Sequence, residues 1–239
     1  MRPLRQESKR QERYLTHPGR AVVSGGALLA LVLVTAVLIP VGPLGIDSRW
    51  AELMQDIQQP WLKQVALVFN ALGRGWSWVT IAAIAIVLAS ARRWVALVAF
   101  AVTEAVTSFL VAVIKALVDR PRPVDQIIHP HGSSFPSGHA AYAAATTVAL
   151  VLLFTMPGRN RWPWFTLVAL ASAGMAWSRT YLQVHWLSDV AAGATLGLAV
   201  TLTTFATIQI LQQHRSGEAL YEPPVHSGAR EVETQSARR

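Results

Sequence analysis

The sequence predicts an all-α, polytopic membrane protein with six transmembrane helices and a short interfacial helix on the outer side. Of its 239 residues, 52% are hydrophobic and only 14% are charged, whereas an ordinary soluble domain carries about 25% charged residues. The mean hydropathy is +0.35, and long uncharged stretches alternate with short polar ones. Together these features favour a single integral membrane domain.

The composition also limits the class of function. The chain has no cysteine, so neither a disulfide framework nor a cysteine metal site is possible. Its net charge of +8 could suit nucleic acid, but the basic residues are divided among short segments between apolar runs. Membrane topology explains that distribution better, so we expect the membrane as a partner and no nucleic acid.

The first predicted membrane helix follows a basic leader. Residues 1–20 carry six arginines and lysines and no apolar periodicity, so we expect a disordered cytoplasmic segment. Residues 21–41 then contain no charge over 21 residues, about the length that crosses the hydrocarbon core. This stretch is longer than a signal-peptide core and has no convincing small-residue cleavage site, so it should stay attached as the first span.

A mixed polar and apolar segment, residues 46–75, separates the first span from the second. Trp50, Leu53 and Ile57 fall at helical spacing among charged residues, which predicts a short amphipathic helix at the outer interface. We expect this helix to act as a connector. Helping a lipid to enter is the alternative role.

Five further apolar segments complete the predicted bundle. They cover residues 76–91, 94–114, 139–156, 164–181 and 186–210. In the last of them, Gly193 and Gly197 permit a close helix approach, for which the alanine-rich fourth span is the expected partner. The predicted membrane domain covers residues 21–211, and residues 212–239 are expected to form a disordered cytoplasmic tail.

One carboxylate lies inside a predicted span. Glu104 is in the middle of residues 94–114, where an ionisable side chain needs a partner or a water-lined cavity. It shares a helical stripe with Ser108 and Lys115, so this stripe should face the bundle interior. We expect a structural pairing or the floor of a hydrated pocket for Glu104 rather than a catalytic role.

The distribution of basic residues predicts the orientation in the membrane. With both termini in the cytoplasm, 14 of the 21 lysines and arginines fall on the inner side, as the positive-inside rule requires. Six spans then place the polar segments around residues 115–138 and 179–189 on the outer side. We expect a cell-membrane protein whose chemistry faces the periplasm or the exterior.

The segment SRTYLQVHWLSD, residues 178–189, carries ionisable side chains among apolar residues. Such side chains are costly beside a bilayer, so their presence indicates a function. If the chain is helical after His185, the spacing of four puts Asp189 on the same face, where its carboxylate can hold an imidazole N–H. The other ring nitrogen is then free to act as a nucleophile or a base. Arg179 supplies a fork of N–H donors that suits phosphate or carboxylate oxygens.

A second polar segment, FPSGH at residues 135–139, follows a loop and opens a long apolar segment. Ser137, Gly138 and His139 therefore lie at a predicted helix N-terminus. Free backbone N–H groups and the positive end of the helix dipole meet there, so this is a natural site for an anion.

A third segment, KALVDRPRP at residues 115–123, adds Lys115 and Arg122 at the other end of that loop. The three segments resemble the signature of the type 2 phosphatidic acid phosphatase family. This signature is a lysine followed after six residues by RP, then PSGH, and then SR followed after five residues by a histidine and after three more by an aspartate. The members of this family are membrane lipid phosphate phosphatases, related to the vanadium haloperoxidases. Every defining position matches in order. Arg120 also precedes a proline, but it lies only five residues after Lys115, so Arg122 takes the motif position.

The predicted chemistry is phosphoryl transfer, and the resemblance implies the same roles. The transition state needs charge neutralised on its non-bridging oxygens. The groups that suit this are those of Lys115, Arg122, Ser137, Gly138 and Arg179. His185 would attack phosphorus and form a phosphohistidine, while Asp189 holds its tautomer. His139 would protonate the leaving alkoxide and later help to deprotonate water. This scheme requires no metal and no other cofactor.

The predicted substrate is a phosphorylated lipid that enters from the outer leaflet and loses its terminal phosphate. Undecaprenyl diphosphate, phosphatidylglycerophosphate and phosphatidic acid all share the group that the motifs bind. Nothing in the sequence reads the lipid tail.

Three alternatives stay open. His129 and His131 could bind a metal together with His139, although no acidic or cysteine partner has suitable spacing. A lipid-headgroup transporter or flippase could use the same buried charges, although we see no inverted internal repeat. A haloperoxidase-type oxidant would use the same pocket, but such chemistry gains nothing from a bilayer.

Overall fold

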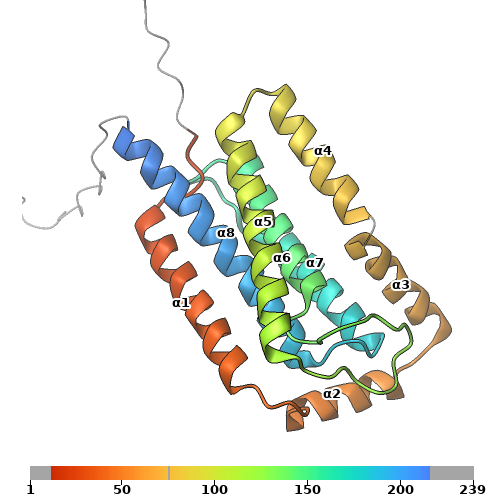
Figure 1. Ribbon diagram of the computed structural model, residues 1–239. Helices are drawn as coiled ribbons and strands as arrows, with labels where there is room; N and C mark the ends of the chain where they lie inside the picture. Colours follow the sequence, from red (N-terminus) through yellow and green to blue (C-terminus); the bar gives the residue numbers. More distant parts are fainter. Residues whose placement is uncertain (1–11, 75, 216–239) are drawn as a thin grey trace, which may run out of the picture.

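The structure is a computed structural model that describes residues 12–74 and 76–215. Every regular element in these residues is an α-helix (Figure 1). The helices are α1 (Pro18–Leu38), α2 (Gly45–Asp56), α3 (Pro60–Arg74), α4 (Trp76–Ser90), α5 (Trp94–Val118), α6 (Gly138–Phe154), α7 (Trp162–Tyr181) and α8 (Leu187–Arg215). The all-α prediction is confirmed for the described part of the chain.

The ends of several helices follow from local sequence chemistry. Pro18 and Pro163 lie in the first turns of α1 and α7, where a missing N–H leaves no bond unmade. Helix α5 ends where Asp119 adopts a left-handed backbone conformation with φ of 42°. Helix α6 begins after Ser137, whose hydroxyl accepts a hydrogen bond from the Ala140 amide and so caps the helix.

The helices form a bundle around α6 and α8 (Figure 1). Helix α8 packs against both α1 and α6, while α5 and α7 also contact α6. Helix α3 lies against α7, and α4 lies against α5. Helix α2 crosses one end of the bundle, beside the loop of residues 119–137 and the turn between α7 and α8. The catalytic candidates lie at this end.

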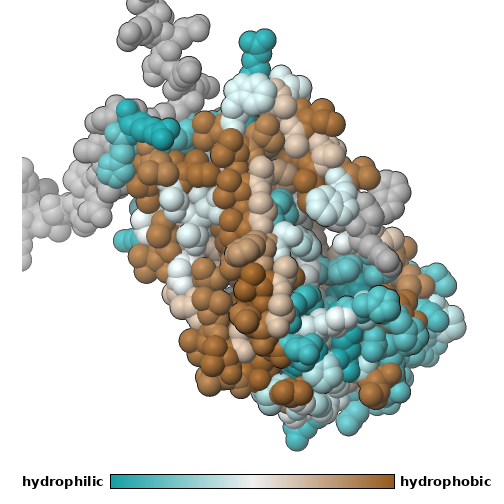
Figure 2. Space-filling model, in the orientation of Figure 1, coloured by the Kyte–Doolittle hydropathy of each residue, from teal (hydrophilic) through white to brown (hydrophobic). Residues whose placement is uncertain are grey.

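The segments expected to span the membrane are all helical, but their span count stays a prediction. Three helices, α1, α5 and α8, are long and apolar enough to cross a membrane by themselves, and α3 with α4 would make a fourth as one bent span. Helix α6 is apolar but has 17 residues. Hydrophobic side chains cover much of the bundle surface, and hydrophilic ones gather at the end near α2 (Figure 2).

The close approach expected for Gly193 and Gly197 is present between α8 and α6. A Cβ atom added to Gly193 would collide with the Ser137 carbonyl, and one added to Gly197 would collide with the Ala141 carbonyl. The expected pairing with the alanine-rich helix is therefore confirmed. This contact ties the start of α6, which carries His139, to the helix that follows His185.

The chain from Glu12 onward is packed against the bundle, whereas the sequence predicts a disordered leader over residues 1–20. Tyr14 is 1% exposed, and its ring meets Phe205 edge-on. The Gln209 side chain accepts hydrogen bonds from the amides of Tyr14 and Leu15 and donates one to the Leu15 carbonyl. A buried aromatic ring and satisfied backbone groups explain the order.

The other end of the domain also differs from the expected boundary. Helix α8 continues to Arg215, beyond the predicted end of the last span at residue 210. The expected disordered segments at residues 1–11 and 216–239 lie outside the described residues.

Gly197→Ala tests the packing of α6 on α8. The new methyl group would push against the α6 backbone, and such overpacking typically costs about 1–3 kcal/mol. We expect a lower midpoint of thermal unfolding in detergent. Gly26→Ala in α1 is the matched control, because nothing lies within 4 Å of its added Cβ; it should be neutral or slightly stabilising. Equal midpoints for the two variants would contradict the contact.

Candidate active site

The three polar segments picked out by the sequence meet at one end of the bundle, beside α2 (Figure 1). Lys115 lies in the last turn of α5, Arg179 in the last turn of α7 and Asp189 in the first turn of α8. Arg122 follows α5 in the loop of residues 119–137, and His185 lies in the turn before α8. Ser137, Gly138 and His139 form the start of α6.

His185 is held between a carboxylate and a guanidinium. Its Nδ1 lies 3.5 Å from Asp189 Oδ2, an ion-pair separation that is long for a hydrogen bond. Its Nε2 lies 3.3 Å from Arg122 Nη1. Because a guanidinium can only donate, Nε2 must be the accepting nitrogen and Nδ1 carries the proton. The lone pair of Nε2 therefore faces the cationic side of the site.

The surroundings keep His185 neutral. The pKa of His185 is lowered to about 4, mainly by burial; Asp189 acts in the opposite direction, and the charges of Arg122 and Lys115 add to the effect of burial. The ring is 6% exposed. Near neutral pH the imidazole is therefore unprotonated at Nε2, which is the form that can attack phosphorus.

His139 shares this site. Its electrostatic partners are Arg179, His185, Arg122 and Lys115, so groups from α5, α6, α7 and both connecting segments are close enough to interact. Its Nε2 is buried and has no hydrogen-bond partner among the described residues. A Cβ added to Gly73 of α3 would collide with the His139 ring, so α3 lies directly against it. This nitrogen is available to a ligand.

Neutral acceptors hold the three predicted phosphate-binding cations. Lys115 Nζ donates to the Ser133 carbonyl at 2.5 Å, and Arg122 donates to the carbonyls of Val184 at 2.7 Å and Gly132 at 3.0 Å. Carbonyl oxygens orient these side chains but do not cancel their charge. The site therefore has an excess of positive charge in a poorly solvated place, which favours an anion.

Arg179 is oriented by a residue that the sequence analysis missed. Its Nη1 donates to Asn70 Oδ1 of α3 at 2.7 Å, and its Nε is buried without a partner among the described residues. The partner is again neutral, so the guanidinium keeps its charge. Asn70 carries no sequence signal, because it lies 109 positions from Arg179 and on a helix with no motif.

A capped turn fixes the distance between Arg179 and His185. The Val184 amide donates to the Arg179 carbonyl at 3.1 Å, and the Gln183 amide donates to the Thr180 carbonyl at 3.0 Å. Gln183 has φ of 55°, in the left-handed region. These two bonds with a left-handed residue form a Schellman motif, so the backbone that carries the arginine also determines where the histidine sits.

The start of α6 contributes less through side chains than the sequence suggests. Ser137 is fully buried; its hydroxyl caps α6, and its amide donates to the Asp189 carbonyl at 3.0 Å. A Cβ at Gly138 would make ordinary contacts of 3.5 Å with Val111 and 3.7 Å with Tyr142. The described protein neighbours therefore leave room for a Cβ at Gly138.

Arg120, which the motif assignment leaves aside, has a different environment from Arg122. It is 1% exposed and forms ion pairs with Asp47 at 2.8 Å and Asp189 at 2.6 Å. Carboxylates cancel its charge, so it is not available to an anion. Asp47, in the first turn of α2, is a second residue that the sequence analysis did not single out.

Other candidates lie outside this arrangement. In the described part of the chain, no group of three histidine or acidic side chains is placed to hold a metal ion. The His129 side chain is exposed, and His131 meets Arg122 through its carbonyl at 3.4 Å. Glu104 is buried in α5 as expected, where it accepts a hydrogen bond from the Thr146 hydroxyl at 2.8 Å.

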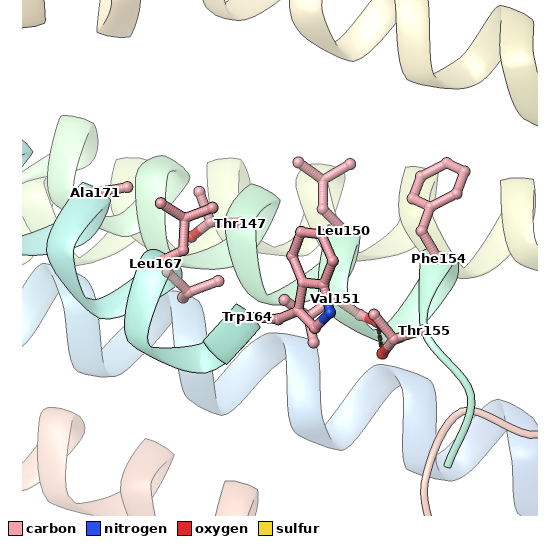
Figure 3. A pocket seen from close by; sticks show the side chains of 9 residues that line it. Thr147, Leu150, Val151, Phe154, Thr155, Trp164, Leu167 and Ala171 are labelled. Carbon is pink, nitrogen blue, oxygen red and sulfur yellow. Dashed lines mark hydrogen bonds between the residues drawn. The ribbon is translucent and has the colours of Figure 1, made fainter. Parts of the chain in front are cut away.

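A cavity of about 390 Å³ lies between α6 and α7, away from the site (Figure 3). Its walls are mostly apolar side chains from the second half of α6 and the first half of α7, including Leu150, Phe154, Trp164 and Leu167. The candidate catalytic residues are at the opposite ends of these two helices. The cavity belongs to the hydrophobic surface of the bundle and not to the site.

Comparison with known proteins gives a family and two sequence relatives. The pattern of the PAP2 superfamily matches residues 94–213. The chain is 27% identical over 199 residues to an undecaprenyl-diphosphatase of Sulfolobus acidocaldarius, covering 77% of the chain and 89% of that protein. It is 30% identical over 151 residues to phosphatidylglycerophosphatase B of Bacillus subtilis, covering 59% of the chain and 73% of that protein.

Two solved structures share the fold. The PAP2-type phosphatidylglycerolphosphate phosphatase from Bacillus subtilis superposes with a TM-score of 0.63 at 20% identity, over 83% of the chain and 99% of that structure. Aquifex aeolicus LpxE superposes with a TM-score of 0.57 at 21% identity, over 67% of the chain and 95% of that structure. At these identities the likeness concerns the fold alone.

Variants of Asn70 test whether uncancelled charge on Arg179 binds the anion. Asn70→Ala removes the anchor that orients a buried guanidinium, a loss of about 1–3 kcal/mol, so inorganic phosphate should bind roughly 5- to 150-fold more weakly. Asn70→Asp keeps the anchor but cancels the charge, and should weaken binding at least as much. Calorimetric titration with phosphate measures both.

The matched control for these variants is Asn160→Ala, which removes an exposed asparagine in the turn between α6 and α7. Its affinity for phosphate should equal that of the wild type. Unchanged affinity in Asn70→Asp would show that the charge of Arg179 does not contribute to binding.

Proposed function

This chain belongs to the PAP2 superfamily, and we propose that it removes the terminal phosphate of a phosphorylated lipid through a phosphohistidine on His185. Hydrolysis of lipid phosphates is the activity that its relatives' names share. The observation that carries the proposal is the meeting of a neutral, oriented imidazole with three cations whose contact partners are uncharged.

Binding of the phosphate would use the uncancelled charge. Lys115, Arg122 and Arg179 would supply charged hydrogen-bond donors, and the Gly138 N–H at the start of α6 would supply a backbone donor. A phosphate group brings charge that carbonyl partners lack, so it competes well for these donors. The same groups would stabilise the transition state, in which negative charge spreads over the non-bridging oxygens.

The first chemical step would transfer the phosphoryl group to the protein. Nε2 of His185 attacks phosphorus, and the bond between phosphorus and the bridging oxygen breaks in line. The negative charge of the bound phosphate favours protonation of His139, which then gives its proton to the leaving oxygen. The positive charge that develops on the imidazole of His185 is stabilised by Asp189, 3.5 Å from Nδ1.

The second step would restore the enzyme. A water molecule attacks the phosphohistidine, and His139, now neutral, accepts its proton. The bond between phosphorus and Nε2 breaks, inorganic phosphate leaves, and both histidines return to their starting forms. Because Lys115, Arg122 and Arg179 can neutralise the charge of the phosphoryl group, the proposed reaction needs no metal.

The lipid nature of the substrate is supported by the position of the site. It lies at one end of a bundle whose flanks expose many large hydrophobic side chains (Figure 2), so a phosphorylated headgroup could reach the cations while its tail stays in the bilayer. Undecaprenyl diphosphate, phosphatidylglycerophosphate and phosphatidic acid all carry the required group.

The orientation is part of the same proposal. We place the domain of residues 21–211 in the cell membrane with six spans, both termini in the cytoplasm and the site at the outer face. The charge distribution supports this, because Arg93, Arg159, Arg161 and Arg215 lie at the end of the bundle opposite the site. The order seen from Glu12 onward moves the beginning of the packed chain to that residue.

His185→Ala tests the nucleophile. Purified protein in detergent with EDTA should release phosphate from a lipid phosphate, whereas the variant should lose at least about a thousandfold in kcat, because it cannot form the proposed phosphohistidine. His129→Ala is the matched control, since that side chain is exposed outside the site. Absence of release by the wild type would support a headgroup transporter; full activity in His185→Ala would show that another group attacks.

The pH dependence tests the neutral state of His185. Its pKa is lowered to about 4, so Nε2 stays unprotonated as the pH falls through the ordinary histidine range and is protonated only near pH 4. The acid limb of log kcat/KM should therefore lie well below 6.5. Two lipid phosphates with different phosphate pKa values separate the ionisation of the substrate from that of the enzyme. A substrate-independent limb near 6.5 would contradict the assignment.

A further inference from the structure

A buried charge cluster joins the outer helix α2 to the carboxylate that faces His185. Arg120 Nη1 donates to Asp189 Oδ1 at 2.6 Å, and Arg120 Nη2 donates to Asp47 Oδ2 at 2.8 Å. All three side chains have no exposed surface. They come from α2, the loop after α5, and α8, so the cluster is a tertiary contact among three elements.

Asp47 is fully committed to this cluster. Its Oδ1 accepts from the Ser188 amide, and its Oδ2 accepts from the Ser188 hydroxyl, both at 2.8 Å. Its Oδ2 also accepts from the Leu44 amide at 3.0 Å. The Ser188 hydroxyl receives a further hydrogen bond from Arg120 Nη1 at 2.8 Å. Four donors therefore fix Asp47 against the residue that precedes Asp189.

The two oxygens of Asp189 have separate tasks. Oδ1 accepts from Arg120, whereas Oδ2 accepts from the Trp186 amide at 2.9 Å and faces His185 Nδ1 at 3.5 Å. Because both oxygens are held, the carboxylate cannot rotate away from the imidazole. The hydrogen bonds of the Arg120 side chain go to Ser188, Asp189, Asp47 and the Gly42 carbonyl, so its link to His185 is the carboxylate of Asp189.

The charges in the cluster do not cancel. Two carboxylates share one guanidinium, which leaves one negative charge for the imidazolium that develops on His185. Without the charge of Asp47, Arg120 would neutralise Asp189 alone. Without Arg120, two carboxylates would remain in a buried place beside the same ring. Asp47 and Arg120, which lie outside the family motif, therefore set the net charge beside His185 as well as the geometry of Asp189.

We propose that Asp47 and Arg120 are positioning residues that set the orientation and the charge of Asp189 and, through it, the basicity of His185. This inference rests on the proposed role of His185 as the nucleophile. It gives α2 a part in catalysis: the helix expected as a connector supplies one of the charges that balance the reaction centre.

Four variants separate this role from a purely structural one, in phosphate-release assays across pH. Asp47→Asn keeps the shape and removes a negative charge; kcat should fall about tenfold, and the acid limb of log kcat/KM should move to lower pH. Arg120→Gln removes the positive charge and should move the limb up by about one pH unit. The double variant restores the net charge and should return the limb towards the wild type. Trp50→Phe removes the hydrogen bond from α2 to the Thr180 hydroxyl without a change of charge.

The other charged groups near His185 are the same in every variant. Arg122, Lys115 and His139 face the ring from the loop, from α5 and from α6, and Asp189 faces it from α8. A shift of the acid limb between variants therefore measures the effect of the charges of Asp47 and Arg120. Trp50→Phe should lower the melting temperature and leave the limb in place, which shows what loosening α2 does by itself.

The outcomes are distinguishable. Opposite shifts in Asp47→Asn and Arg120→Gln support the inference, whereas limbs that coincide with the wild type, or that move in the same direction, overturn it. If Arg120→Gln does not fold, the single variants Asp47→Asn and Arg120→Lys are compared instead. Arg120→Lys keeps the positive charge and should leave the acid limb unmoved, whereas Asp47→Asn should move it to lower pH. Failure of the proposed function itself appears separately, as an inactive wild type or an active His185→Ala.

Discussion

Uncancelled positive charge at one end of a hydrophobic bundle is the constraint on which the site depends. Lys115, Arg122 and Arg179 are each held by neutral oxygens, from backbone carbonyls or from Asn70. Such partners orient a cation without removing its field, so the charge is kept for an anion that arrives from outside. Burial keeps His185 unprotonated, and the same field acts in the same direction. The positive charge thus contributes both to the binding of phosphate and to the neutral state of the nucleophile.

The contrast between the two neighbouring arginines shows how the fold separates function from support. Arg122 meets carbonyls and the Nε2 of His185, whereas Arg120, two residues earlier, is enclosed by Asp47 and Asp189. The two side chains have the same chemistry, and their partners decide their roles. Arg122 stays available to a ligand, whereas Arg120 holds Asp189 in place.

The bundle supplies rigidity where the chemistry needs it. The glycine contacts of α8 on α6 hold the start of α6 beside Asp189, and the capped turn after α7 fixes Arg179 relative to His185. Helix α3 closes the inner side of the site through Asn70 and the contact of Gly73 with His139. Flexible side chains thus project from a backbone with little freedom, which suits a reaction that relies on preorganised charges.

The sequence alone determined the local features: the apolar helices, the helix start at residues 137–139, the ordered motif with His185 and Asp189, and the glycines that let α8 approach α6. Each of these follows from spacing along the chain, because hydropathy, capping and helical periodicity are short-range effects. The sequence also predicted six membrane spans. In the described residues, three helices are long and apolar enough to be membrane spans by themselves. Only the tertiary structure decided the partners of the charges. Asn70 meets Arg179 across 109 positions, and Asp47 meets Arg120 across 73. No local pattern marks such pairs, since the energy of a buried charge depends on the groups that folding brings around it.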